Sequence, residues 1–535
     1  MVTAILVDKT DNVAMVTAPV EKGQKIYVAV TGQIIVALEN INAGHKVALV
    51  RLKTGENAVK YGIPIGRITS TVDVGGWIST HNLEDTTEDL CGEYCRQFRE
   101  GVKDIKAFPE EKISVRKIKA YPRKNGSFGI RNYIMVIATT PESNAVAEGI
   151  SDKTGCSWFV CDTTRLVEGK ITGYTENAMI FTGRNPNLYA VLVIGSDTGA
   201  SDSRGICDAI AETGKPIHYL ATDGIDYQKA IRDGVAVIKG FQNDAAKLKR
   251  ELVSMEGFGL TVHCSGSDWT TAINGNSALG AAADIFVKHG GRVFMTEWME
   301  WSGSQHLMAE KCSTRELGLE LLDTVEEVRE TVLRETGLPV EHMNPAPSNI
   351  EGGLTTLVEK STGTIRKAGS TPIQGLLEYC EQPTGKGVWL PKHNSVWPPT
   401  TAIYGSLSGA HMSVLNTGIG YLYFEIPHML CIRTTGNPTT YQNESYKIDF
   451  NAGIVFEGRP ISEVGKILFD YLLRIAEGDD DPKTENSKER AFNMYYYTEN
   501  EFGKDTDRSK MLTAIVKNYH DNCKKYTDSV KGGKE

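Results

Sequence analysis

The stretch that decides the fold is LTVHCSGSDWTTAINGNSALGAAADIFVKHGGRVFMTEWMEWSG, residues 260–303. It starts with a run of buried-strand character, LTVHCSG (260–266), and continues through the helix-like ALGAAADIFVKHGG (278–291). A second apolar run, RVFMTE (292–297), follows. Strand, helix and strand in this order predict a βαβ unit whose two strands lie parallel in one sheet. Such sheets bind ligands at the carboxyl ends of their strands.

Three earlier runs repeat the pattern: YIMVIATT (133–140), AVLVIGSD (190–197) and IHYLATD (217–223). Helix-like stretches lie between them, and each run ends in a polar cluster such as TTPESN or SDTGASD. Polar clusters at the ends of parallel strands favour a binding pocket, and hence an enzyme. We therefore expect a Rossmann-like α/β domain over residues 117–255 and a C-terminal α/β domain over residues 256–535.

The N-terminal residues 1–83 have a different pattern. Short β-branched runs (KIYVAV, GQIIVAL and KVALVRL) are separated by turn signals, which predicts a compact β-rich module. Residues 84–116 are charged and lack a strong apolar stripe, so we expect a linker with one helix. The predicted fold class is therefore α/β: a small β-rich module, a Rossmann-like parallel-sheet body and a C-terminal α/β domain.

Length and composition limit the class of protein. A chain of 535 residues is expected to form two or three domains. Its net charge of −9 is spread along the chain without a basic stripe, which argues against a nucleic-acid partner but not against a small anionic substrate. We find no apolar run of 18 residues and no signal peptide, so neither a membrane span nor export is expected. The ten scattered cysteines predict reduced thiols in a cytoplasmic protein.

One pair of cysteines is close in sequence. CGEYC (91–95) spaces its two thiols by three residues, and nothing nearby completes a zinc set. Ordinary thiols on a helix are the favoured interpretation.

The opening stretch contains several candidates for chemistry. Cys264, Ser267 and Asp268 follow the first strand, where small residues with free N–H groups can hold a carboxylate or phosphate. Glu297 and Glu300 follow the second strand and could bind a divalent metal or divide acid and base roles. In the alternative interpretation, Asp268 caps a helix and the glutamates are solvated. Spacing alone leaves both open.

Residues 346–370 form a second polar cluster around a Gly-Gly turn, and its two lysines suit a polyhydroxylated anion. A solvated helix carries the same Glu-Lys pairing, so that alternative stays open. The candidates are Asn349, Thr355, Glu359, Lys360, Ser361 and Lys367.

A third candidate is RKNGSFGIRNYIMV (123–136), which places Arg131 and Asn132 before a strand. The arginine could bind a carboxylate with two parallel hydrogen bonds. It could equally fix the segment that enters the domain.

Taken together, these stretches resemble the UxaA-type sugar-acid dehydratases, the altronate and galactarate dehydratase family. The pieces that carry the resemblance are AGHKVAL, YGIPIG, THNL, GSFGIRNY, CSGSDWTTAINGNSALG, GGRVFMTEWMEWSGSQHL, SNIEGGLTTLVEKSTGTIRKAG and IDFNAG. They cover nearly the whole chain in the expected order. The N-terminal module is similar to a SAF domain.

The resemblance implies loss of water from aldonic or aldaric acids to give 2-keto-3-deoxy acids, with dependence on iron. Such a reaction needs a base for the α-proton, a cation or donors for the enediolate, and an acid for the departing hydroxyl. The resemblance also implies a SAF histidine that faces the pocket, which transfers to His45 and His81, with Lys46 and Asn82 beside them. Without the resemblance, each histidine would be an ordinary core or surface side chain.

The chain departs from the family pattern where relatives carry cysteines. It has TTPESN (139–144), DTTRLVEG (162–169) and GSDTG (195–199) at those places, so that Ser143 and Thr198 stand roughly where thiols would be. We therefore expect neither an iron–sulfur cluster nor thiolate-bound iron. A divalent ion (Fe²⁺, Mn²⁺ or Mg²⁺) stays a candidate cofactor.

The resemblance and the patterns together assign roles. Proton transfer is expected of His45, His81, Glu297, Glu359 and Lys360, and metal contact of His45, His81, Asp268 and Glu300. The side chains expected to bind the substrate are Lys46, Asn82, Arg131, Asn132, Cys264, Ser267, Asp268, Asn349, Thr355, Thr356, Ser361 and Lys367.

The predicted protein is a cytoplasmic hydro-lyase for a small hydroxylated carboxylate. It is expected to form a homodimer or higher homo-oligomer, without nucleic-acid or membrane partners. Two alternatives remain: a lyase that eliminates another group, such as sulfite, and an inactive relative that binds a sugar acid.

Overall fold

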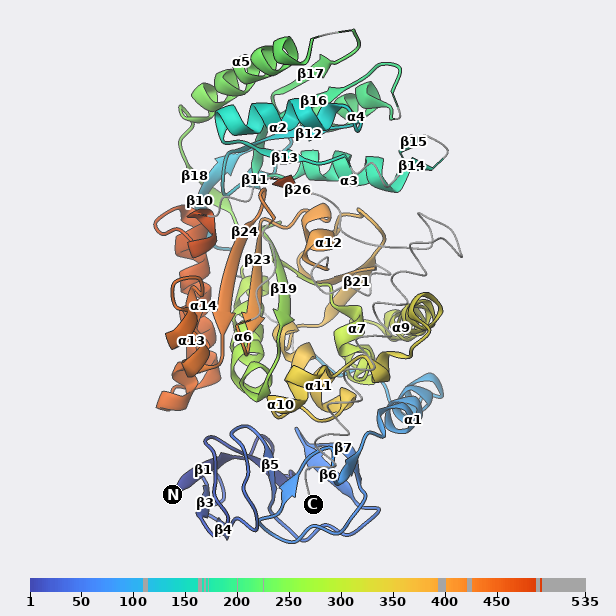
Figure 1. The fold of residues 1–535 in the computed structure, drawn as a ribbon, viewed down its shortest axis with the longest axis vertical. Coiled ribbons are helices and arrows are strands. Elements are labelled where there is room, and N and C mark those ends of the chain that lie inside the picture. The colour runs from blue at the N-terminus through green and yellow to red at the C-terminus, as the bar shows by residue number, and fades with distance from the viewer. Residues whose placement is uncertain are drawn as a thin grey trace.

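The computed structural model describes residues 1–108, 114–161, 166–167, 170–171, 173–199, 201–224, 226–392, 401–420, 426–486 and 491–492. Three parts follow one another along the longest axis of the molecule (Figure 1). The N-terminal module lies at one end, the second domain at the other, and the C-terminal domain between them. The C-terminal domain therefore borders both of the others.

The N-terminal module is built from short strands, as predicted. Its sheets have the strand orders β4-β3-β1-β2-β5-β8 and β6-β7-β9. Exposed and buried residues alternate along β3 and β6, because each has one face on the module's core. The strands are β1 (Val2–Ile5), β2 (Val13–Val16), β3 (Lys25–Val28), β4 (Ile34–Val36), β5 (Lys46–Ala48), β6 (Asn57–Lys60), β7 (Ile63–Ile68), β8 (Trp77–Ile78) and β9 (Leu83–Glu84).

One helix, α1 (Thr87–Arg99), lies in the stretch 84–116 between the module and the second domain. A small antiparallel sheet then joins the two larger domains. It consists of β11 (Phe128–Gly129), β10 (Lys117–Pro122) and β18 (Glu251–Ser254), in that order.

The second domain contains a parallel sheet with the order β17-β16-β12-β13-β26. The predicted strand runs are confirmed. β13 lies on one side of β12 and β16 on the other, so the direction in which strands are added reverses between β12 and β16, and polar residues follow both of these strands. Its strands are β12 (Tyr133–Ala138), β13 (Ser157–Phe159), β16 (Leu188–Gly195), β17 (Ile217–Ala221) and β26 (Ala491–Phe492), with the pair β14 (Leu166–Val167) and β15 (Lys170–Ile171). Its helices are α2 (Ser143–Thr154), α3 (Gly173–Arg184), α4 (Ser203–Ala211) and α5 (Tyr227–Ala245).

The C-terminal domain contains the larger parallel sheet, with the order β21-β22-β20-β19-β23-β24-β25. Its strands are β19 (Gly259–Ser265), β20 (Arg292–Met295), β21 (Ile373–Leu377), β22 (Gly387–Pro391), β23 (Met412–Thr417), β24 (Leu430–Thr435) and β25 (Phe450–Asn451). The helices are α6 (Asn276–Lys288), α7 (Trp298–Trp301), α8 (Gln305–Ala309), α9 (Arg315–Thr336), α10 (Pro347–Glu351), α11 (Leu357–Ile365), α12 (Thr401–Leu407), α13 (Pro438–Glu444) and α14 (Ile461–Glu477). Shorter turns are the π-helix η2 (Thr271–Gly275) and the 3₁₀ helices η3 (Val340–His342), η4 (Arg366–Ala368), η6 (Ala452–Glu457) and η7 (Lys483–Asn486).

The predicted βαβ unit is confirmed: β19 and β20 pair in parallel, and α6 connects them. β19 is buried along its full length, because helices cover both faces of the sheet. α14 packs along α6 (Figure 1). Gly280 of α6 allows close approach of η4, since a Cβ there would lie 2.0 Å from the Arg366 carbonyl oxygen. None of the helices within the described ranges is long and apolar enough to cross a membrane.

Candidate active site

A buried group of charged side chains lies at the carboxyl ends of β19 and β20. We call it the inner cluster and define it as Cys264, Glu297, Glu300, Lys360 and Lys367. Cys264 is near the end of β19, and Glu297 and Glu300 follow β20. Lys360 comes from α11 and Lys367 from η4. Residues about a hundred positions apart in sequence therefore meet because two parallel strands end side by side.

The centre of the inner cluster is an ion pair. The Lys367 ammonium donates to Glu297 Oε2, and both side chains are fully buried. Lys367 Nζ also lies 3.3 Å from Cys264 Sγ, and the Cys264 backbone N–H donates to Glu297 Oε1 and Oε2 at 3.0 and 3.1 Å. The alternative that these glutamates are solvated is therefore wrong.

The inner cluster holds protonation equilibria close to neutral pH. Burial, with the adjacent Glu297 carboxylate, raises the pKa of Glu300 from 4.5 to about 7. Burial also lowers the pKa of the Lys360 ammonium, which is half-buried and donates to Asn344 Oδ1. For Lys367, burial opposes the charged form, but Cys264 and Glu297 raise its pKa above the ordinary value. A carboxyl group of raised pKa and two lysines whose pKa values are shifted in opposite directions thus lie within one cluster.

A second buried group joins the N-terminal module to α11. We call it the interface triad: Lys46, Lys60 and Glu359, all with fully buried side chains. Lys46 Nζ lies 2.9 Å and Lys60 Nζ 2.7 Å from oxygens of Glu359. Lys46 also donates to the Gly353 carbonyl at 3.0 Å and to Thr355 Oγ1. The solvated-helix alternative for this Glu-Lys region is therefore wrong.

The interface triad keeps its charges at neutral pH. Burial disfavours the Glu359 carboxylate, yet Lys46 and Lys60 lower its pKa from 4.5 to about 2. Burial lowers the pKa of Lys46 to about 8 although Glu359 opposes the shift. Hydrogen bonds occupy both oxygens of Glu359 and the Lys46 ammonium, so these groups attach the module to the C-terminal domain.

The two predicted histidines lie on either side of Trp77. The ring centroid of Trp77 is 5.4 Å from that of His45 and 4.8 Å from that of His81. His45 Nδ1 accepts from Trp77 Nε1 at 3.2 Å, and His45 Nε2 lies 3.0 Å from the Glu351 carbonyl oxygen. Nε2 therefore carries the proton, and burial lowers the pKa of His45 to about 4. The histidines share one site at the module interface.

Two of the four residues expected to hold a metal, His45 and Asp268, have their ligand atoms in hydrogen bonds. Both ring nitrogens of His45 make hydrogen bonds, one as acceptor and one as donor. The Asp268 carboxylate accepts hydrogen bonds from Thr270, Thr271 and Asn437. Within the described ranges, no group of three or more His, Cys, Asp and Glu side chains could hold a metal ion. Neutral nitrogens and free carboxylate oxygens are what divalent metals require.

Asp268 stabilises the start of the π-helix η2, which matches the helix-capping alternative. Its Oδ1 accepts from the backbone N–H groups of Thr270 and Thr271 at 2.9 and 3.0 Å. Its Oδ2 accepts from Asn437 Nδ2 at 2.9 Å. The carboxylate thereby fixes the loop that follows Cys264 rather than pointing a free oxygen at a ligand.

Several predicted binding residues support the loops around the clusters. Asn349 Nδ2 donates to the Ser267 carbonyl at 2.7 Å, and Ser267 Oγ lies 3.7 Å from Cys264 Sγ. Thr356 caps α11 and donates to the Ile65 carbonyl at 2.6 Å. The remaining two, Ser361 and Asn82, bond to nearby backbone, in α11 and in the turn before β9.

Arg131 and Asn132 lie at the entry to the second domain. Arg131 donates to the Ile475 carbonyl at 3.0 Å and to Asp481 Oδ1 at 3.2 Å, and Asn132 Oδ1 accepts from Arg123 at 2.9 Å. These contacts match the alternative in which Arg131 fixes the entry segment. The arginine joins the domain to the end of α14.

Hydroxyl groups occupy the places where the sequence lacks the family thiols. Ser143 Oγ lies 2.7 Å from Thr140 Oγ1, and Thr198 Oγ1 donates to Asp223 Oδ1 at 3.1 Å. Of the segment 162–169, residues 162–165 and 168–169 lie outside the described residues. The ends of β12 and β16 are therefore lined by oxygen rather than sulfur.

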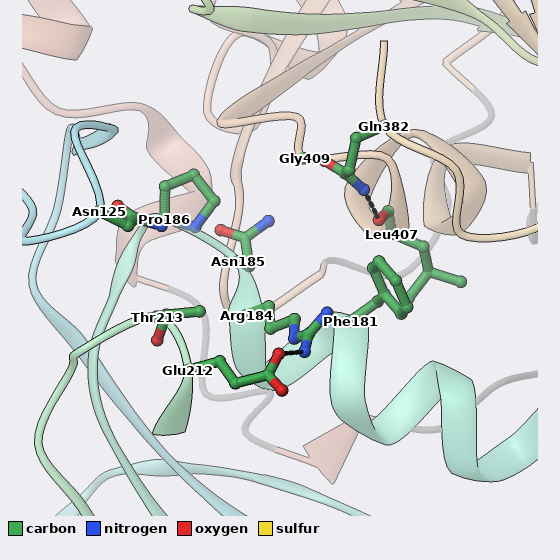
Figure 2. Close-up of a pocket in the computed structure, with 10 residues that line it drawn as sticks. All are labelled: Asn125, Phe181, Arg184, Asn185, Pro186, Glu212, Thr213, Gln382, Leu407 and Gly409. Atoms are coloured by element: carbon green, nitrogen blue, oxygen red, sulfur yellow. Dashed lines mark hydrogen bonds and ion pairs between the residues drawn. The ribbon is translucent and has the colours of Figure 1, made fainter. Parts of the chain in front are cut away.

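A cavity of about 300 Å³ lies where the second and C-terminal domains meet (Figure 2). In it Arg184 faces Glu212, and Gln382 donates to the Leu407 carbonyl at 2.8 Å. It contains none of the predicted site residues. Its lining residues are Asn125, Phe181, Arg184, Asn185, Pro186, Glu212, Thr213, Gln382, Leu407 and Gly409.

Sequence reasoning missed three polar side chains of these sites: Lys60, Trp77 and Asn344. A signal existed for Lys60, because alternation along β6 puts it on the same buried face as Ala58. Trp77 and Asn344 had no such signal, since their partners His45 and Lys360 come from other segments.

Comparison with known proteins matches three domain models of one family to this chain. They are the altronate/galactarate dehydratase SAF domain over residues 2–86, the D-galactarate dehydratase/altronate hydrolase second domain over 120–246, and the D-galactarate/altronate dehydratase C-terminal domain over 255–499. Each of the three structural parts thus corresponds to one of these models.

Whole-chain relatives agree. The altronate dehydratase of Bacillus subtilis (strain 168) is 26% identical over 500 residues, which is 89% of this chain and 96% of the relative. The galactarate dehydratase (L-threo-forming) of Escherichia coli (strain K12) is 24% identical over 522 residues, 89% of this chain and 92% of the relative. The (2R)-sulfolactate sulfo-lyase subunit beta of Chromohalobacter salexigens is 29% identical over 361 residues, 67% of this chain and 92% of the relative.

A SAF-type module docked on an α/β body, with a buried amine–carboxylate cluster at the strand ends, defines a multidomain α/β enzyme. The chain belongs to the altronate/galactarate dehydratase family.

Proposed function

We propose that the inner cluster carries out the elimination of water from a small polyhydroxylated acid, of the aldonic or aldaric type. The protein is a hydro-lyase, and its product is a 2-keto-3-deoxy acid. The altronate and galactarate dehydratases among its relatives support this class. The observation that carries the assignment to the inner cluster is the meeting of Glu300, Lys360 and Lys367 around Glu297 at the strand ends.

The groups of the inner cluster match the needs of the reaction. Lys367, held charged by Glu297, offers a cation to the substrate carboxylate and to the enediolate that forms from it. Lys360, whose pKa burial lowers, is suited to take the α-proton. Glu300, with a pKa of about 7, is partly protonated at neutral pH and is suited to protonate the departing hydroxyl.

Substrate needs access to these groups. Glu297 and Lys367 are fully buried and Lys360 is half-buried, so a local opening beside Lys360 precedes binding. Within the interface triad, Lys46 and Lys60 hold Glu359, the residue before Lys360, in place. The start of α11 therefore stays fixed while Lys360 moves. His45 and His81 border the same region at the module interface.

Turnover of purified protein tests the proposal. Altronate, galactarate and a panel of other aldonic and aldaric acids are incubated with the protein, and the keto acid is measured. We expect keto acid from at least one member. Absence of product from all of them, together with thermal stabilisation by one, would favour the inactive sugar-acid binder instead.

A second candidate is elimination of sulfite from a sulfonated hydroxy acid. It is favoured by the 29% identity to the (2R)-sulfolactate sulfo-lyase subunit beta. The chemistry differs only in the leaving group, so sulfolactate belongs in the same panel. Release of sulfite without formation of keto acid from sugar acids would favour this candidate.

The cofactor, the assembly and the location are part of the proposal. We expect turnover without thiolate-bound iron. We also expect the protein to form a dimer or higher oligomer and to lie in the cytoplasm with its thiols reduced. Metal analysis, light scattering and cell fractionation measure these three properties. Iron with stoichiometric sulfide in isolated protein would contradict the first.

A further inference from the structure

The helix α1 presents two thiols on one face, at the surface between the linker and the C-terminal domain. Cys91 is buried and Cys95, one turn later, is half-buried. The two residues are four positions apart on α1, so their side chains are neighbours on the helix surface. No third group is close to them in the sequence, but the fold brings one.

That group is His306 on α8. Cys91 Sγ lies 3.4 Å from His306 Nδ1, and the Tyr94 ring stacks on the imidazole with 4.9 Å between centroids. Burial lowers the pKa of His306 to about 3, so its Nδ1 is available as an acceptor. The Cys91 thiol therefore has a hydrogen-bond acceptor in contact.

The second thiol, Cys95, has the features of the cysteine that a peroxide oxidises first in redox sites. Cys95 is half-buried, and Cys91 lowers its pKa, an effect to which Arg99 and Arg329 add, whereas Cys95 and burial raise the pKa of Cys91. Accessible thiols of lowered pKa next to a second cysteine are the common form of peroxide-sensitive sites.

We propose that Cys95 and Cys91 form a peroxide-sensitive dithiol that closes into a disulfide within α1 and lowers turnover at the inner cluster. The Cys95 thiolate attacks a hydroperoxide, which oxidises it to sulfenic acid and releases hydroxide or alkoxide. Cys91 sulfur then attacks the sulfenic sulfur, the S–S bond forms as the S–O bond breaks, and the Cys91 proton passes to the departing hydroxyl, which leaves as water. A dithiol reductant reverses the closure by thiol–disulfide exchange.

Helix geometry makes this disulfide possible but strained. Residues four apart in an α-helix have Cα atoms about 6.2 Å apart, inside the range that disulfides span. Their Cβ atoms are about 5–6 Å apart, beyond the roughly 3.5–4.5 Å of a relaxed disulfide. Closure therefore distorts one turn of α1 and pulls Cys91 from His306. Strained disulfides are readily reduced, as a reversible site requires.

Both sides of the Cys91–His306 contact are attached to α11, which carries Lys360. At the start of α1, Thr87 Oγ1 accepts from Val358 N at 3.0 Å, and Asp85 just before it accepts from Leu357 N at 2.7 Å. Ser304, just before α8, lies 2.9 Å from both hydroxyls of a Ser-Thr pair on α11. Distortion of α1 therefore displaces α11, and a displacement of about 1 Å costs on the order of a hundredfold in rate.

The test uses the full-length reduced protein treated with hydrogen peroxide and quenched with an alkylating agent. Mass spectrometry of the unreduced digest should show a Cys91–Cys95 disulfide at peroxide levels that leave Cys264 reduced. Turnover should fall on the order of a hundredfold and return with dithiothreitol. This arm rests on the proposed function, so hydrogen exchange of the peptide covering Leu357–Ile365 is measured as well and should rise on oxidation.

Variants separate the steps. Cys95→Ser should form no disulfide and keep its turnover in peroxide, whereas Cys91→Ser should accumulate a sulfenic acid on Cys95 that a dione probe traps. Cys431→Ser removes another half-buried thiol and should respond as the unmodified protein does.

Two results would overturn the proposal. One is the lack of the disulfide in the peroxide-treated protein. The other is a disulfide that changes neither exchange of α11 nor turnover. A protein without turnover on any acid would contradict the proposed function, while the disulfide and exchange readouts would still decide the redox site.

Discussion

The interface triad and the inner cluster are both built from buried lysines and glutamates, and they meet at adjacent residues of α11. In the triad, Glu359 is surrounded by donors, and its two lysines lower its pKa to about 2. In the inner cluster, burial and Glu297 raise the pKa of Glu300 to about 7. The same residue types thus give fixed charge in one place and exchangeable protons in the other. What differs is that two lysines bond directly to Glu359, whereas Glu300 has the Glu297 carboxylate as a neighbour.

The largest effect on turnover is expected from a change of Glu300 in the inner cluster. Glu300→Gln keeps the shape but removes the proton that the leaving hydroxyl needs, so kcat should fall by about 10²–10⁴-fold. Steady-state kinetics on the substrate found in the panel measure this. Because an acid with a pKa of about 7 is lost as the pH rises, kcat should also decline above pH 7. A kcat that is flat from pH 6 to 9 would contradict the role of Glu300.

A second test removes the carboxylate of the interface triad. Glu359→Gln leaves two buried ammonium groups without an anionic partner, which should lower the free energy of unfolding by about 3–5 kcal/mol. Urea denaturation measures the loss. The folded protein lowers the pKa of Glu359 from 4.5 to about 2. The difference in free energy of unfolding between the unmodified protein and Glu359→Gln should therefore be full above pH 4.5 and vanish as the pH falls toward 2.

Glu378→Gln is the matched control for that variant. It breaks the exposed pair with Lys392, whose atoms lie 2.7 Å apart, and it should cost about 0–1 kcal/mol. Equal losses for the two variants would mean that the interface triad carries no special stability.

A smaller effect is expected at His45, which belongs to neither cluster. His45→Ala leaves the Trp77 N–H and the Glu351 carbonyl without their partner, which should cost about 1–3 kcal/mol of stability. Turnover should fall less than in Glu300→Gln. A loss of kcat equal to that of Glu300→Gln, with an unchanged fold by circular dichroism, would instead assign proton transfer to His45.

The smallest effect is expected from a chelator. His45 and Asp268 have no free ligand atoms for a metal, so EDTA should leave kcat within twofold, a change of about 0.4 kcal/mol. Recovery of lost activity by Fe²⁺, Mn²⁺ or Mg²⁺ would contradict this expectation.

The sequence predicted the elements well, because buried parallel strands are continuous apolar runs. LTVHCSG and RVFMTE became β19 and β20, and the polar residues after them entered the inner cluster as expected. The β-rich module and its strands also follow from the pattern. Those features depend on a few neighbouring residues, which is why they can be read without the fold.

The pairings could not be read in the same way. Nothing local indicates that Lys46 and Lys60 share Glu359, some three hundred positions away, or that His306 lies against Cys91. Arg131 illustrates the same limit, since its partners on and after α14 lie more than three hundred positions on. Long-range contacts depend on how domains dock, and one sequence does not contain that information.

Glu359 and Lys360 are consecutive residues whose side chains leave α11 in different directions, toward the module and toward the strand ends. One residue turns an α-helix by about 100°, so inserting or deleting a single residue before Glu359 would move both side chains out of their partners' reach. A chimera that exchanges the SAF-type module between relatives must therefore carry Lys46, Lys60 and the whole of α11 as one unit. In this protein, the helical phase of α11 thus sets how the module and the strand-end cluster are placed together.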